Sequence, residues 1–158
     1  MGLEHYFWTF FLSMFPFTEL RVAIPLAIQK FGMSPYEAYF FGVLGNIFPN
    51  LFILYALDPV SKFLMKHSKF FNVFFSKLFD KTRTKHSKKF QEYGALFLVL
   101  FIAIPLPGSG SWTGSLIAFL FGVAYWRALF LVSLGVMIAG LIITLGFTGA
   151  IKFFEWVI

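Results

Sequence analysis

Residues 104–114 read Ile104-Pro105-Leu106-Pro107-Gly108-Ser109-Gly110-Ser111-Trp112-Thr113-Gly114 and interrupt one of the most apolar parts of the chain. No charged residue lies in 95–103 before this stretch or in 115–125 after it. Its prolines and glycines cannot continue a helix. A broken backbone in lipid must be buried against protein or line a cavity, because no water is there to bind its N–H and C=O groups. By analogy with broken transporter helices, we interpret the break as a functional site rather than a plain loop.

The composition predicts an integral membrane protein. The chain has 158 residues, of which 59% are hydrophobic, 22% are aromatic and only 13% are charged. A soluble domain carries roughly 25% charged residues, and a small one buries a smaller share of its apolar surface. There is no cysteine, which excludes disulfides, thiol chemistry and thiolate metal sites.

The position of the positive charges matters more than the formal net charge of +6. Nine of the thirteen Lys and Arg residues lie between Lys62 and Lys89, where Asp80 is the only acid. A basic block between membrane segments is typical of a cytoplasmic loop that faces anionic lipids, and we expect no nucleic-acid partner. Glu4 precedes the first apolar run in place of a basic region, so we expect no cleaved signal peptide.

The first half begins with a helix too short to cross. Residues 5–17 are apolar and as a helix would reach roughly 20 Å, short of a hydrocarbon core of roughly 30 Å. Pro16 follows, and residues 18–25 then carry Glu19 and Arg21 inside an apolar stretch. Charges at such positions usually face a cavity or each other. We therefore predict that 5–31 is a helix–break–helix hairpin that enters the membrane and turns back.

A full crossing is predicted to follow over 36–57. Ser34 can be its N-cap, with Pro35 at the first helical position and Glu37 completing a capping box. The 22 residues of this segment would span about 33 Å. Its apolar character is interrupted by Gly42, Gly45, Asn46, Pro49 and Asn50. Asp58 and Pro59 are expected to end it.

Residues 60–81 alternate aromatic residues and lysines at helical spacing, which predicts an amphipathic basic helix in the headgroup plane. Binding of a calmodulin-like partner is typical of the same pattern. Residues 82–89 are predicted to form a polar loop. His67 and His86 are interpreted as solvated or interfacial, because no acid or third histidine lies at a metal-ligand spacing.

The second half matches the first when the sequence is shifted by 90 residues. Leu44-Gly45 then falls on Leu134-Gly135, and the two breaks and two crossings coincide. Residues 90–103 lead into the second break, 115–126 lead out of it, and the second crossing runs from Arg127 to about Phe147 or Ile151. We predict a single membrane domain with repeat one at 5–57, a linker at 58–89 and repeat two at 90–151.

The predicted fold class is therefore an all-α polytopic membrane protein. It is an inverted repeat of a re-entrant helical hairpin plus a transmembrane helix, joined by the amphipathic basic helix. Each hairpin changes side zero times and each crossing once, so the hairpins enter from opposite faces and their tips meet near the midplane. This places 60–89 in the cytoplasm and both termini outside a plasma membrane.

The tips carry the candidate site residues. Glu19 is either a proton-coupling carboxylate, because burial disfavours its ionised form, or a structural ion pair with Arg21. Arg21 could instead hold an anionic headgroup, since a guanidinium forks onto phosphate oxygens. The second tip is either an anion nest of backbone N–H groups and hydroxyls or a helix cap provided by Ser109, Ser111 or Thr113. Trp112 is interpreted as a packing or interface residue.

Two motifs resemble the signatures of the putative small multi-drug export protein family. They are Glu19-Leu20-Arg21-Val22-Ala23-Ile24-Pro25 and Pro105-Leu106-Pro107-Gly108-Ser109-Gly110-Ser111-Trp112-Thr113-Gly114. The layout is similar to the DedA superfamily, which implies two opposed re-entrant hairpins and proton-dependent transport or flipping of lipids, including polyprenyl-phosphate carriers. That superfamily has arginines in its second hairpin, whereas 104–115 has none here and the nearest is Arg127.

Three functional hypotheses follow. The first is a DedA-like, proton-coupled transporter or lipid flippase that moves an anionic lipid or organic ion between the tips. The second is a small multidrug/proton antiporter, against which the positive charge of Arg21 argues. The third is a membrane-organising protein that acts through the basic helix. We expect no enzyme, because hydrolysis would need a Ser/His/acid set that the sequence lacks, and no cofactor or metal, because phosphate-loop and metal motifs are absent. The expected partners are membrane lipids at 60–89 and a second copy of the chain. The candidate site comprises Glu19, Arg21, Pro25, Pro105, Pro107, Gly108, Ser109, Gly110, Ser111, Trp112, Thr113 and Gly114.

Overall fold

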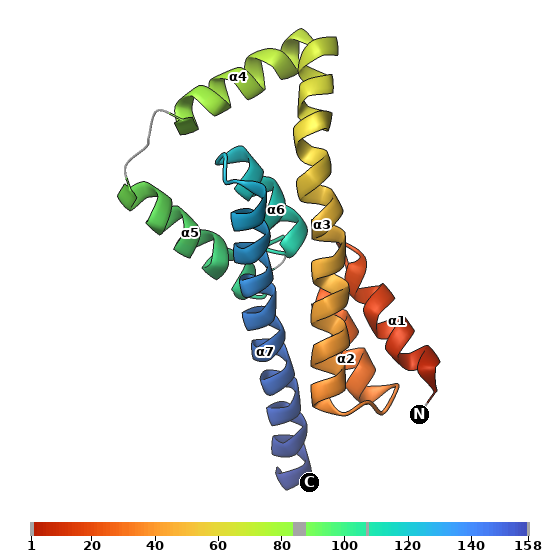
Figure 1. Cartoon of the computed structure of the whole chain (residues 1–158). Coiled ribbons are helices and arrows are strands. Elements are labelled where there is room, and N and C mark those ends of the chain that lie inside the picture. Colours follow the sequence, from red (N-terminus) through yellow and green to blue (C-terminus); the bar gives the residue numbers. More distant parts are fainter. Residues whose placement is uncertain (1, 84–87, 107, 158) are drawn as a thin grey trace.

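The computed structural model describes residues 2–83, 88–106 and 108–157, with the side chains of 78–83, 88–92 and 154–157 outside the description. These residues form helices and connecting turns and contain no strand. The helices are α1 Leu3–Met14, α2 Glu19–Gln29, α3 Pro35–His67, α4 Lys69–Arg83, α5 Lys88–Ala103, α6 Ser111–Leu120 and α7 Tyr125–Val157 (Figure 1).

The structure confirms an interruption of the helix in each half, but residues 18–25, where the first break was predicted, lie almost entirely in α2, and residues 111–114 of the second predicted break belong to α6. The chain bends at 15–18 between α1 and α2, and it leaves the helical conformation again at 104–110 between α5 and α6. Pro16 and Pro105 lie in these bends, where a residue without an N–H cannot continue the helical ladder. Pro107 and the central part of the predicted 82–89 loop, including His86, lie outside the described residues.

The first long helix does not end at Asp58 and Pro59, as the sequence predicted, but continues to His67. Pro59 removes one helical hydrogen bond, but residues after the proline make hydrogen bonds and an ion pair with Asp58 before it. The Ser61 hydroxyl donates to the Asp58 carbonyl at 2.9 Å, and the Lys62 ammonium lies 2.6 Å from the Asp58 carboxylate. The helix ends at Ser68, whose φ of −139° and ψ of 122° are extended.

The predicted amphipathic helix at 60–81 is consequently divided. Its first turns belong to α3, and α4 begins after the extended Ser68. The second long helix also begins earlier than predicted, at Tyr125, and ends later, at Val157. Its C-terminal turns contain glycines and threonines, and each Thr hydroxyl is satisfied by a bond back to its own helix. The Thr144 bond to the Gly140 carbonyl is 2.8 Å long and the Thr148 bond to the Thr144 carbonyl is 2.7 Å long.

The capping box at the start of α3 is confirmed. The Ser34 hydroxyl accepts from the Glu37 N–H at 3.4 Å, and the Ser34 N–H donates to the Glu37 carboxylate at 3.0 Å. The Tyr6 hydroxyl also donates to this carboxylate at 2.7 Å, which ties the start of α1 to the start of α3.

Replacing Ser34 with alanine is expected to lower the free energy of unfolding by about 1 kcal/mol, because one N–H at the start of α3 loses its partner. Denaturant unfolding of the detergent-solubilised protein would measure this, with Ser76→Ala in the exposed part of α4 as control. An unchanged unfolding midpoint for Ser34→Ala would mean that Tyr6 and Glu37 alone hold this helix end.

The two long helices lie side by side, and the short helices pack around them (Figure 1). The N- and C-termini are at one end of the molecule, together with the turn between α2 and α3. The bend between α1 and α2 lies beside the middle of α3, and α4 extends away from α3 at the other end (Figure 1).

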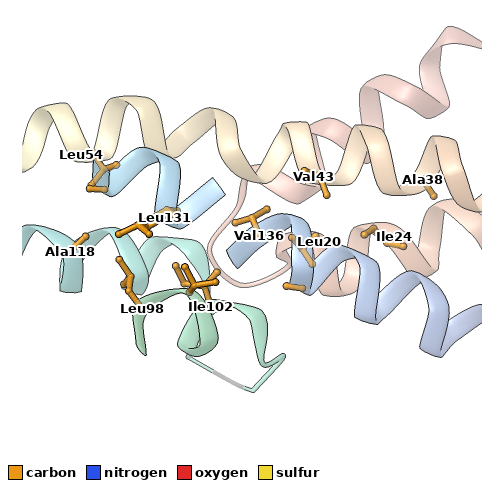
Figure 2. Packing of buried hydrophobic residues seen from close by; sticks show 14 of the residues in the cluster. Leu20, Ile24, Ala38, Val43, Leu54, Leu98, Ile102, Ala118, Leu131 and Val136 are labelled. Atoms are coloured by element: carbon orange, nitrogen blue, oxygen red, sulfur yellow. The ribbon is translucent and has the colours of Figure 1, made fainter. Parts of the chain in front are cut away.

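The buried core consists of aliphatic side chains from five helices. Figure 2 shows Leu20 and Ile24 of α2 and Val136 of α7 on one side, and Leu98 and Ile102 of α5 on the other. Each long helix also has a glycine where a short helix crosses closely. A Cβ at Gly45 would overlap the Phe10 backbone of α1, and a Cβ at Gly135 would lie 2.7 Å from the Ile102 Cβ of α5.

Two helices, Pro35–His67 and Tyr125–Phe153 as far as side chains are described, are long and apolar enough to cross a membrane. Many large apolar side chains point outward from the molecule, including Phe52 of α3, which is 61% exposed, and Phe130 of α7, which is 65% exposed. Lipid can cover such a surface, whereas water would make it costly.

Candidate functional site

Glu19 is the first residue of α2 and is buried, with 6% of its surface exposed. Its φ of +44° is the only positive value among the described non-glycine residues, and such a backbone costs of order 1–3 kcal/mol unless its surroundings hold it. The carboxylate lies directly against Gly110, where a Cβ would overlap it. The Ser111 N–H donates to the same carboxylate.

This contact explains how α6 begins. Gly110 is the N-cap of α6, and no side chain of the second tip caps it, so the predicted capping by Ser109, Ser111 or Thr113 is wrong. The Glu19 carboxylate from α2 takes that role, because a negative charge is favourable beside the free N–H groups at a helix start. The first tip therefore supplies the cap of the second.

Arg21 crosses between the two tips. Its Nε lies 3.8 Å from the Glu19 carboxylate, beyond hydrogen-bond distance. Its terminal nitrogens donate to the Leu106 carbonyl and, at 3.1 Å, to the Ser109 hydroxyl. Arg21 thus takes part in the ion pair that the sequence predicted, but both of its terminal nitrogens bond to the second loop.

Ser109 shapes the second loop from inside. Its hydroxyl accepts from the Leu106 N–H at 3.1 Å, and it lies 2.6 Å from the Ile104 carbonyl and 2.9 Å from the Leu106 carbonyl, to one of which it donates. Gly108, with φ of +83°, makes the turn that this loop requires. Because these groups bond to one another, the loop is a folded structural unit in this conformation rather than an open anion nest.

The remaining candidate residues have different positions. The Trp112 indole N–H donates to the Met14 carbonyl at 3.2 Å and so joins the second tip to the end of α1. Gly114 faces α5, where a Cβ would overlap the Ile102 side chain. Pro25 lies half-buried inside α2, Thr113 is half-buried on α6, and Pro105 is exposed.

A set of buried polar residues was missing from the predicted site. The Ser115 hydroxyl of α6 donates to the Asn50 carboxamide oxygen at 2.9 Å, and the Asn50 amide donates to the Asn46 carbonyl at 2.6 Å. The Asn46 amide donates to the Ser13 carbonyl of α1 at 3.0 Å. The available signal was the pair of asparagines one turn apart in a predicted membrane crossing, where buried polar residues are rare and functional.

Comparison with models of known protein families identifies the family of the chain. The family model described as "Putative small multi-drug export protein" matches residues 19–142. The chain belongs to this family. The match contains both sides of the tip contact, from Glu19 and Arg21 to the 105–114 loop, together with α3 and most of α7. Searches of curated proteins and of solved structures gave no match.

The small multi-drug export family member is thus a membrane protein whose two broken helices touch through one carboxylate, one guanidinium and one folded loop. Such a contact can hold the tips together while Glu19 is ionised and weaken when its charge is removed.

Replacing Gly110 with alanine is expected to push the Glu19 carboxylate away from the Ser111 N–H. The carboxylate can move because it ends a flexible side chain, so we expect a loss of about 1–3 kcal/mol in unfolding free energy and a loosened tip contact. Limited proteolysis within 104–110 would detect the loosening, with Gly108→Ala as a comparison that strains φ without touching Glu19. Unchanged cleavage in Gly110→Ala would contradict the close contact.

Proposed function

We propose that this family member is a proton-coupled membrane transporter of the DedA-like type, with Glu19 as the coupling group. The observation that supports this most directly is the buried Glu19 carboxylate, which lies between two broken helices and is the cap of one of them. An ionisable group inside a membrane domain marks an ion or proton pathway by default.

The proposed layout is an inverted repeat of two re-entrant hairpins in the plasma membrane, with 60–89 cytoplasmic and the termini outside. Three equivalences support it. Helices α3 and α7 both have 33 residues, and their first residues, 35 and 125, are 90 positions apart. Gly32 and Gly122, which are also 90 positions apart, lie just before these two helices and have φ of +64° and +67°. Gly45 and Gly135 occupy matching positions under α1 and α5.

The proposed step is a proton binding to the Glu19 carboxylate. The ionised form attracts both the Ser111 N–H and Arg21. Protonation removes this charge and weakens both contacts, so the tips separate and substrate can pass between them. Release of the proton on the opposite side restores the closed contact and completes one cycle.

Two substrate classes fit this site. An anionic lipid or organic anion would have to take Arg21 away from Leu106 and Ser109, which now hold it. A lipophilic cation would need only the carboxylate, but it would still meet the positive charge of Arg21, whose hydrogen-bond partners Leu106 and Ser109 are neutral. Because the family's description names small multi-drug export, we keep multidrug/proton antiport beside the lipid-transport hypothesis.

The test is flux through purified protein in liposomes, with and without a pH gradient, for a lipophilic cation and for a labelled anionic phospholipid. We expect transport of one class to depend on the gradient and to reverse with it. Arg21→Ala is expected to abolish lipid transport if Arg21 binds the headgroup, and to leave cation transport measurable if it only holds the loop. No gradient-dependent flux of either probe would overturn the proposal.

We also propose that α4 lies on an anionic membrane surface. Phe70, Val73 and Phe74 are exposed on one side of it, and Lys69 and Lys77 are exposed as well. The expected insertion is about 5–10 Å into the headgroup boundary.

A homodimer remains a prediction, supported by the large apolar surface outside the core.

A spin label at Phe74→Cys is expected to be more accessible to oxygen than to a water-soluble nickel complex in liposomes with anionic lipid. A label at Asn72→Cys should show the reverse. Equal access of the nickel complex to both positions would contradict the surface position of α4. Normal transport after replacing Lys69 and Lys77 with glutamine would contradict a purely membrane-organising role for the chain.

A further inference from the structure

The interface between α1 and α3 contains buried polar groups beside two aromatic pairs, Tyr6–Phe41 and Phe10–Phe48. The Ser13 hydroxyl of α1 donates to the Gly42 carbonyl at 2.6 Å, and the Asn46 amide of α3 returns a bond to the Ser13 carbonyl at 3.0 Å. One turn earlier on α1, the Thr9 hydroxyl lies 3.2 Å from the Met33 sulfur and 2.8 Å from the His5 carbonyl. Thr9, Ser13 and Asn46 are each at most 1% exposed.

This polar interface, which we call the α1–α3 seam, continues to the candidate site. Asn50 lies one turn beyond Asn46 and bonds to Ser115 of α6. Ser111 lies one turn before Ser115 and bonds through its N–H to Glu19. The seam therefore runs from His5, in the first turn of α1, to the Glu19 carboxylate at the start of α2. Helix α1 begins at the end of the molecule that carries both termini (Figure 1).

The two ends of the seam hold polar atoms that need a partner. Among the described side chains, His5 Nδ1 and Ser111 Oγ are the buried atoms without a hydrogen bond. A buried unsatisfied polar group in a native protein usually has a water, an ion or a functional role. Their positions, one at the entrance and one beside Glu19, are those that a water molecule entering or leaving the seam would contact.

The corresponding interface in the second half is different. Where α5 crosses α7, the buried residues are Leu98, Val99 and Ile102 against Gly135 and Leu131, all of them apolar. Separating such surfaces in water costs roughly 25 cal/mol per Å² of apolar area. Separating α1 from α3 would also part the Tyr6–Phe41 and Phe10–Phe48 ring pairs. Its polar groups, however, would exchange internal hydrogen bonds for bonds to water, which changes the free energy little.

We infer that the α1–α3 seam is the route by which water and coupling protons reach Glu19 from the side of the N-terminus. The seam is closed in this structure and opens when α1 moves away from α3. Waters that enter it carry the proton, which leaves bulk water and ends as the O–H of the Glu19 carboxyl group. The charged or titratable groups along the route are His5, Tyr6 and Glu37 at its entrance and Glu19 and Arg21 at its inner end.

The transfer of a proton to Glu19 rests on the proposed function, whereas the entry of water into the seam does not. Because the sequence has no cysteine, water entry can be tested separately with introduced cysteines. Thr9→Cys and Ser13→Cys are nearly isosteric and should fold. In oriented liposomes, a membrane-impermeant cationic methanethiosulfonate added on the N-terminal side is expected to modify both. Ala27→Cys in the apolar core and Val99→Cys at the α5–α7 interface, which are 0% and 7% exposed, are the matched dry controls.

Absence of modification at Thr9→Cys and Ser13→Cys in a transporting protein would overturn the seam and leave the proposed function in place. Modification of these positions in a protein that transports neither probe would support the seam and overturn the proposed function. Equal modification of the core controls would also overturn the seam, because it would show general loosening. If a cysteine variant fails to fold, hydroxyl-radical labelling of the unaltered protein replaces it. We then expect oxidation of Met33, and an unoxidised Met33 would overturn the seam.

Discussion

Glu19→Gln is expected to reduce proton-driven transport to the level of protein-free liposomes. A glutamine can still accept a hydrogen bond from the Ser111 N–H through its amide oxygen, and it has nearly the same volume, so the tips should remain packed. It cannot bind and release a proton, so the contact can no longer be switched by a pH gradient. The measurement is substrate flux against the size of the gradient, for the substrate that the wild-type protein carries.

Glu4→Gln is the matched control, because Glu4 is exposed at the start of α1 and contacts neither tip. It should transport at the wild-type rate. Glu19→Asp retains the charge but shortens the reach to Ser111, so we expect partial transport with preserved gradient dependence. Full gradient-dependent transport by a folded Glu19→Gln variant would remove Glu19 from the coupling role.

Gly45→Ala is expected to be the most destabilising small substitution in the chain. The added Cβ would overlap the carbonyl and Cα of Phe10, which are backbone atoms and cannot rotate away, so α1 must move from α3. Overpacking of this kind costs typically 1–3 kcal/mol, and here it also strains the Ser13–Gly42 and Asn46–Ser13 hydrogen bonds. Denaturant unfolding in detergent, followed by circular dichroism, would measure the loss.

Gly146→Ala in α7 is the control that separates this effect from helix propensity. No atom lies within 4 Å of a Cβ built there, and alanine is favoured over glycine in a helix by up to about 1 kcal/mol. Gly146→Ala should therefore leave stability unchanged or raise it. If Gly45→Ala behaved in the same way, the close approach of α1 to α3 would be contradicted.

The arrangement of helices was largely predictable from local chemistry. Prolines and glycines within 104–114 identified the second break, and Ser34 with Glu37 identified the start of α3. The first break was expected at 18–25 but lies at 15–18, around Pro16 and before the charged residues. The end of α3 was not predictable, because Pro59 is tolerated where Ser61 and Lys62 bond back to Asp58. The inverted, re-entrant arrangement of the halves in the membrane remains a prediction for the labelling and flux experiments.

The sequence identified residues of the candidate site, but it did not predict the contacts between them. Glu19 and Arg21 stood out because charges are rare in apolar stretches. That Glu19 caps a helix 92 positions later, and that Arg21 holds Leu106 and Ser109, depends on packing between distant segments and has no local signal. The α1–α3 seam was missed for a similar reason, because single Ser and Thr residues in an apolar helix usually bond to their own backbone.

The length of the two long helices has a consequence for the membrane that surrounds them. A helix of 33 residues measures about 50 Å, whereas the acyl-chain region of a bilayer is about 30 Å thick. In the proposed orientation the last turns of α3 project into the cytoplasm and those of α7 project outside. A thinner bilayer would require greater tilt or exposure of both rods. Lipid chain length is therefore expected to alter the angle between them, and with it the spacing of the two tips.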